Sequence, residues 1–136
     1  MRNPYSTRPY QHVLEPLFAY LMIAQKQYEE GQYAGWYNVG PDECDCVTTG
    51  GLVNLFCRKW GNSLSWKNQA EKNAPHEANF LKLDCSKIKS IFDWKPRWHI
   101  EDAIGMTVAW TKVWLKHGDI PAEMNRQIRI YVEDKQ

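Results

Sequence analysis

Apolar residues recur at every third or fourth position between residues 12 and 30, which is the spacing of one face of an α-helix. The repeating positions are Val13, Leu14, Leu17, Phe18, Leu21, Ala24 and Tyr28. Pro16 falls early enough to occupy the first turn, where a missing backbone N–H costs little. Gly31 follows the pattern and is a residue type that commonly ends helices. We therefore predict a helix over residues 12–30.

Helical spacing returns further along the chain, and capping residues mark its limits. Residues 48–60 begin at threonines that can cap a helix, and they end at Gly61. Residues 100–117 carry two apolar stripes and are followed by Gly118. Pro121 then suits the first position of a last helix. These signals predict three more helices.

Strand signals in the chain are short. Residues 36–40 form an apolar stretch ended by Gly-Pro, residues 63–67 alternate polar and apolar, and residues 80–84 could add a third strand. A short helix is expected from about Ser86, and it must end before Pro96. The whole pattern predicts an α+β fold that is mainly helical, with about five helices and a few short strands.

Composition and charge exclude several classes of protein. The chain has 136 residues, of which 43% are hydrophobic, so it can bury one core. A formal net charge of +1 gives no basic surface for nucleic acid or an anionic membrane. The longest apolar run, residues 17–24, is too short to cross a bilayer, and the N-terminus lacks an apolar signal region. We expect a cytoplasmic protein with neither nucleic acid nor membrane as a partner.

The four cysteines could be thiols or metal ligands. Cys44-x-Cys46 might bind zinc together with Cys57, Cys85 or His76. Structural zinc sites favour two to four residues between paired cysteines, whereas a single residue separates this pair. The cysteine number also shows no disulfide framework for this length. Reduced thiols without a metal are the favoured interpretation, and a small cysteine-based metal protein stays open as an alternative.

Four motifs occur in one order along the chain. They are the arginine-aromatic segment RPYQHV (residues 8–13), YNVG (37–40), DCSK with FDWKP (84–87 and 92–96) and TVAW (107–110). Together they resemble the C-terminal part of nucleotide-sugar epimerases and dehydratases of the extended short-chain dehydrogenase family. Within that family, the sequences around these motifs are most similar to those of 4,6-dehydratases. The likeness covers nearly the whole chain but only about the last third of such an enzyme.

The resemblance implies an activity that needs more than this chain. In the parent enzyme the sugar is oxidised at C4 by tightly held NAD, water is lost across C5 and C6, and the hydride returns to C6. Residues 1–136 would be a single C-terminal sugar-nucleotide-binding fragment, with the NAD-binding domain not in this chain. No Gly-rich fingerprint for a dinucleotide is present. The one Tyr-x-x-x-Lys match, residues 131–135, is interpreted as chance, so we expect no bound NAD and no dehydratase activity from the chain alone.

The resemblance also implies which residues meet the substrate. By it, Arg8 contacts the pyrophosphate, Tyr10 packs near it, and the segment around His76 and Glu77 reaches the ribose of CDP-glucose or a related nucleotide sugar. An arginine fork suits a diphosphate because its planar donors bind bidentately. No catalytic residue and no metal ligand is assigned. His12 has a pKa near neutrality but no partner at a telling spacing, which favours a structural role.

The family's architecture bears on assembly as well. In it, residues 36–39 belong to the parallel sheet of the cofactor domain, and the helix over residues 12–30 packs beside that sheet. Four apolar residues would then lie open to water: Leu17, Leu21, Trp36 and Val39. We expect a homodimer or higher oligomer that covers them. A free-standing nucleotide- or partner-binding module remains an alternative.

Overall fold

Helices dominate the structure, a computed structural model that describes residues 1–61, 63–70 and 80–134. The helices are α1 (Leu14–Glu29), α2 (Thr49–Trp60), α3 (Ser86–Phe92), α4 (Ile100–Leu115) and α5 (Ile120–Glu133). Two-residue strands β1 (Thr7–Arg8) and β2 (Val47–Thr48) pair antiparallel. The mainly helical α+β fold predicted from the sequence is confirmed. Within the described ranges, no helix is both long and apolar enough to span a membrane.

Side-chain caps mark the starts of α2 and α5, and the threonine cap of α2 agrees with the sequence prediction. Thr48 precedes α2, and its hydroxyl oxygen accepts a hydrogen bond from the Gly51 N–H at 3.0 Å. Gly61 ends the helix with a left-handed φ of 81°. Asp119 caps α5 by accepting from the Ala122 N–H at 2.9 Å. Each cap satisfies a backbone group that has no partner inside the helix.

Two helix ends differ from the expected glycine stops. Gly31 begins a 3₁₀ turn, and α1 ends at Glu29 with Glu30 as its C-cap, whose backbone is extended. At the end of α4, His117 adopts the left-handed conformation with φ 52°. The Gly118 N–H then donates to the Val113 carbonyl at 2.9 Å, and a Cβ at Gly118 would lie 2.9 Å from Val113 Cγ1. Gly118 is therefore needed for close approach, not for its backbone angle.

The strand predictions are mostly wrong. Residues 36–40 and 63–67 are not strands, and residues 80–84 contribute only an isolated parallel bridge between Phe80 and Thr7. A strand needs a ladder of hydrogen bonds to a neighbouring backbone. In the part of the chain that the structure describes, these segments make at most isolated ones, such as the Leu81 N–H to the Thr7 carbonyl at 3.1 Å and the Met1 amino group to the Lys67 carbonyl at 2.9 Å. Val39, expected to be exposed, is partly buried against the core.

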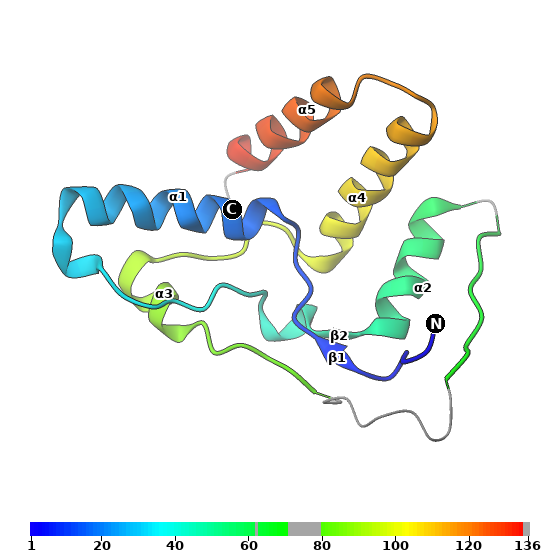
Figure 1. Cartoon of the computed structure of the whole chain (residues 1–136), viewed down its shortest axis with the longest axis horizontal. Coiled ribbons are helices and arrows are strands. Elements are labelled where there is room, and N and C mark those ends of the chain that lie inside the picture. The colour runs from blue at the N-terminus through cyan, green and yellow to red at the C-terminus, as the bar shows by residue number, and fades with distance from the viewer. Residues whose placement is uncertain (62, 71–79, 135–136) are drawn as a thin grey trace.

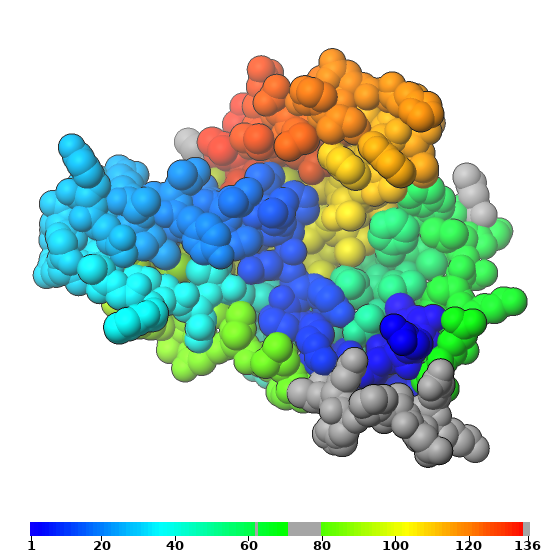
Figure 2. All heavy atoms as spheres, in the orientation of Figure 1, coloured from blue at the N-terminus to red at the C-terminus, as the bar shows by residue number. Residues whose placement is uncertain are grey.

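Two apolar clusters form the core. The first is buried between α1 and α3 and consists of Ala19, Cys85, Ile88 and Trp94. The second joins α2 to α4 and consists of Leu55, Ile104 and Val108. Figure 1 shows α1 and α3 on one side of the molecule and α2 and α4 on the other, with α5 lying across the top beside α1 and α4. Figure 2 shows the same parts as one continuous body.

A buried carboxylate joins these parts. Glu15, in the first turn of α1, is 0% exposed and accepts hydrogen bonds from the Arg97 N–H at 3.0 Å and the Trp98 N–H at 2.8 Å. The Tyr131 hydroxyl of α5 donates to its other oxygen at 2.8 Å. Because an unpaired buried carboxylate is strongly unfavourable, these donors are what allow the group to lie there. Glu15 therefore fastens α1 to the loop before α4 and to α5.

Aromatic and cationic groups surround this carboxylate. The Arg97 guanidinium lies 4.4 Å from the ring centre of Phe18 and donates to the Tyr131 carbonyl at 2.8 Å and to the Val132 carbonyl at 3.1 Å. Burial, together with the bond to Glu15, raises the pKa of the Tyr131 hydroxyl well above its usual value. Tyr131 consequently stays protonated and remains a donor.

The start of α1 is held by a histidine and not by a capping hydroxyl. Val13 precedes the helix without a side-chain cap, and the Leu14 N–H donates instead to His12 Nδ1 at 3.3 Å. The His12 ring packs edge-on against Trp98, with ring centres 4.9 Å apart. Burial lowers the pKa of His12 below 6.5, since it disfavours the charged ring. Protonation would also remove the acceptor that the Leu14 N–H uses.

Replacing Glu15 should weaken the fold strongly. In Glu15→Gln, an NH2 donor replaces one of the two acceptor oxygens and faces a donor group. We therefore expect the free energy of unfolding to fall by about 3 kcal/mol. Urea denaturation at neutral pH measures the change. Glu101→Gln is the matched control, because Glu101 is 63% exposed in its side chain and should change stability by less than about 0.5 kcal/mol. Equal losses in the two variants would contradict the role given to Glu15.

Stability should also depend on the charge of His12. Its folded-state pKa is lowered, so its contribution is fully present above pH 6.5 and is lost as the pH falls through the folded-state value. The stability advantage of the wild type over His12→Gln should therefore shrink as the pH falls below 6.5, as measured by urea denaturation at several pH values. His117→Asn, at an exposed position, should show no such trend. A difference that does not vary with pH would refute this role of His12.

Candidate functional site

Strand β1 carries Arg8, the residue that the sequence analysis predicts to contact the pyrophosphate. Arg8 is opposite Val47 of β2, and one of its guanidinium nitrogens donates to the Thr7 carbonyl at 2.9 Å. The Tyr10 N–H donates to the Arg8 carbonyl at 3.0 Å, which closes a tight turn centred on Pro9. The fixed φ of proline suits such a turn. Arg8 therefore lies on an anchored strand edge next to a stiff turn.

Tyr10 lies beside Arg8 in the sequence and is anchored by its hydroxyl. It shares a hydrogen bond of 2.8 Å with Thr49 Oγ1, which in turn lies 3.0 Å from Ser6 Oγ. The first N–H groups of α2 are already used, since Thr49 donates to the Ser6 carbonyl and Gly50 to the Pro4 carbonyl, both at 2.8 Å. An anion at this corner would therefore be held by Arg8 and not by the helix amides.

His76 and Glu77 lie outside the described residues, so the structure does not test their predicted roles. The nearest described residue after them, Phe80, bridges to Thr7 of β1. The Leu81 N–H donates to the Thr7 carbonyl at 3.1 Å. The chain that follows Glu77 thus returns to the strand that carries Arg8.

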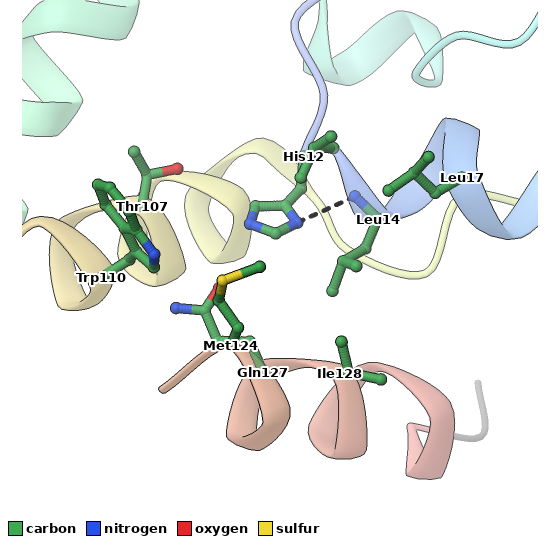
Figure 3. Close-up of a pocket in the computed structure, with 9 residues that line it drawn as sticks. His12, Leu14, Leu17, Thr107, Trp110, Met124, Gln127 and Ile128 are labelled. Carbon is green, nitrogen blue, oxygen red and sulfur yellow. Dashed lines mark hydrogen bonds between the residues drawn. The ribbon is translucent and has the colours of Figure 1, made fainter. Parts of the chain in front are cut away.

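Away from the Arg8 edge, a hollow that the sequence analysis did not predict lies between the start of α1 and the helices α4 and α5. Its volume is about 330 Å³. Figure 3 shows side chains from all three helices or their ends pointing into it. They are His12, Val13, Leu14, Leu17, Thr107, Trp110, Met124, Gln127 and Ile128. The sequence shows the apolar residues that line the hollow as stripes on separate helices. It does not show how the helices pack against one another, and the hollow depends on that packing.

The polar groups of this hollow are already hydrogen-bonded, and Gln127 joins α5 to α4. Gln127 Nε2 donates to the Met106 carbonyl at 2.9 Å and to Glu123 at 2.7 Å, and the Thr107 hydroxyl donates to the Ala103 carbonyl at 2.8 Å. Because the lining is mostly apolar, it does not suit a ligand with two phosphate charges. His12 has neither a carboxylate nor a nucleophile as a hydrogen-bond partner among the described residues, which is consistent with its structural role.

The predicted combinations of cysteine ligands do not assemble among the described residues. The Cys46 thiol points to the Asp42 carbonyl at 3.7 Å, Cys57 lies on α2, and Cys85 is buried in the core. All four cysteines are free thiols, as predicted. One metal-compatible group does occur in the described part of the chain, and it pairs Cys44 with residues that the sequence did not connect to it: Asp45 and His99.

Comparison with known proteins finds a relative that matches nearly the whole chain. No family model matches the chain. Over 133 residues, which are 97% of this chain, it is 42% identical to the CDP-glucose 4,6-dehydratase of Salmonella typhimurium. The chain spans 37% of the length of that relative, an extent consistent with the C-terminal part predicted above. The comparison thus confirms the resemblance predicted from the four motifs: nearly all of this chain is similar to part of a CDP-glucose 4,6-dehydratase.

Proposed function

We propose that this chain supplies the sugar-nucleotide-binding part of a CDP-glucose 4,6-dehydratase, an enzyme that converts CDP-glucose to CDP-4-keto-6-deoxyglucose in cytoplasmic dideoxysugar synthesis. The observation that carries the proposal is the 42% identity over 97% of the chain. The sequence lacks a Gly-rich dinucleotide fingerprint, so NAD chemistry is assigned to the parent enzyme. We propose that this chain binds substrate and is inactive alone.

Arg8 is the proposed diphosphate contact. A nucleotide diphosphate sugar brings two adjacent phosphate charges, which a guanidinium meets with parallel hydrogen bonds. The pairing of β1 with β2 and the turn at Pro9 support this role because they limit how far the arginine backbone moves. Tyr10, held through Thr49, is proposed to pack beside the diphosphate. Pre-organised groups bind with less loss of entropy.

His76 and Glu77 are proposed to reach the nucleotide ribose. What supports the proposal is that Phe80, three residues beyond Glu77 in the sequence, bridges to Thr7, the residue before Arg8. The polar side chains of His76 and Glu77 can hydrogen-bond to ribose hydroxyls.

We further propose that copies of the chain associate through exposed apolar residues on and after α1. Leu17 is 47% exposed, Leu21 is 72% exposed and Trp36 is 91% exposed. On α5, Met124 and Ile128 face the same hollow as Leu17 and are about half exposed. Exposed apolar surface of this kind favours association, because burying it removes it from water.

Loss of Arg8 should weaken nucleotide binding. We expect Arg8→Ala to cost about 1.5 to 3 kcal/mol of binding free energy for CDP, the value of a hydrogen bond to a charged group. Isothermal titration calorimetry measures it, with glucose as the uncharged comparison ligand. Arg129→Ala removes an exposed arginine from α5 and should leave the affinity unchanged. Equal CDP affinity in wild type and Arg8→Ala would remove Arg8 from the site.

A charge on the apolar part of α1 should reduce self-association. Leu17→Glu places a carboxylate on the proposed contact surface, so we expect a smaller average mass by light scattering at low micromolar concentration than for the wild type. Gln25→Glu adds the same charge to an exposed position of the same helix and should keep the wild-type mass. If the wild type is a monomer and Leu17→Glu folds normally, the proposal that copies associate through this surface is wrong.

A further inference from the structure

Three side chains with different ligand atoms meet where the 3₁₀ turn Glu43–Asp45 contacts the start of α4. They are Cys44, Asp45 and His99, and their ligand atoms all lie within 4.8 Å of one another. Asp45 is 4% exposed, whereas Cys44 and His99 are exposed to solvent. A buried carboxylate thus lies behind two groups that solvent can reach.

The Asp45 carboxylate has its two oxygens in different settings. Its Oδ1 accepts from the Ile100 N–H at 2.9 Å, which fixes the orientation of the group. Its Oδ2 is approached by His99 Nδ1 at 2.8 Å and by Cys44 Sγ at 3.7 Å. A carboxylate that binds a metal through one oxygen is commonly held through the other by a hydrogen bond. The Ile100 N–H supplies that support here.

The three donors suit zinc by type and by spacing. Sulfur, imidazole nitrogen and carboxylate oxygen are the ligands that Zn²⁺ takes in proteins, and three of them plus water complete a tetrahedron. Zinc bond lengths place such ligand atoms roughly 3.3 to 3.7 Å apart. Small rotations of Cys44 and His99, both exposed, bring the present spacing into that range.

The surrounding charge also favours a cation. The Asp45 carboxylate lies 2.8 Å from His99 Nδ1, so it attracts a cation at this position. The start of α4 opposes a cation through its helix dipole, by about 0.3 to 1 kcal/mol at an exposed site. A full negative charge in direct contact outweighs that partial charge.

We propose that Cys44, Asp45 and His99 form a zinc site with water as the fourth ligand. Zn²⁺ takes the place of the Cys44 thiol proton, which leaves to solvent, and binds the thiolate and the Asp45 carboxylate, so the charges of ion and ligands balance. His99 binds as the neutral ring through Nδ1, with its proton on the solvent-facing Nε2. The ion thereby ties the 3₁₀ turn to the start of α4, independently of the function proposed for Arg8.

Cobalt titration of the metal-free full chain tests the site directly. Co²⁺ should give thiolate-to-metal charge-transfer absorption and the visible bands of tetrahedral cobalt at one equivalent, and Zn²⁺ should displace it. Cys44→Ser should abolish the charge-transfer band, and His99→Gln should weaken binding at least about tenfold. Zinc should also raise the melting temperature of the wild type but not of Cys44→Ser.

The matched control is Cys46→Ser, since its thiol lies two residues away and points to the Asp42 carbonyl. This variant should bind cobalt like the wild type. Circular dichroism verifies that each variant is folded. If His99→Gln unfolds, the Cys44→Ser variant tests the zinc site by itself, because Cys44 is exposed and its replacement should not disturb the fold. Absence of cobalt bands in the wild type, their persistence in Cys44→Ser, or their loss in Cys46→Ser would each overturn the proposal.

Discussion

The buried carboxylate of Glu15 is the contact on which the arrangement of the helices depends. It lies in the first turn of α1 and is reached by donors from the loop before α4 and from α5. The free-energy cost of burying its charge is met only when these donors are all in place. The position of α1 relative to α5 is therefore set by a buried polar contact, and not by apolar packing alone.

The same contact bears on the candidate binding site. Glu15 fixes the first turn of α1, and His12 holds the Leu14 N–H immediately before it. The segment that leads back to Arg8 is thus fastened at both ends, by α1 on one side and by the pairing of β1 with β2 on the other. A charged group on such a segment is suited to a phosphate ligand, because little freedom remains to be lost on binding.

Some of this structure could be predicted from the sequence and some could not. Caps act over two or three residues, so a threonine before α2 and Gly61 after it mark that helix correctly. Strands need partners that are distant in the sequence, which is why residues 36–40 were misassigned. Glu15 occupies a position in an amphipathic helix where a carboxylate is usually exposed, and only the tertiary fold brings donors from residues 97, 98 and 131 to it. The meeting of Cys44 with His99 has the same long-range origin.

We propose that the β1 edge, with Arg8 and Tyr10, holds a nucleotide diphosphate. Amide chemical shifts of the isotopically labelled chain, recorded during titration with CDP, are the sharpest test of this binding site. We expect saturable shifts of the Thr7, Arg8 and Tyr10 amides and of residues at the start of α2. Shifts confined to the apolar hollow between α1, α4 and α5, or no shifts at high CDP concentration, would contradict it.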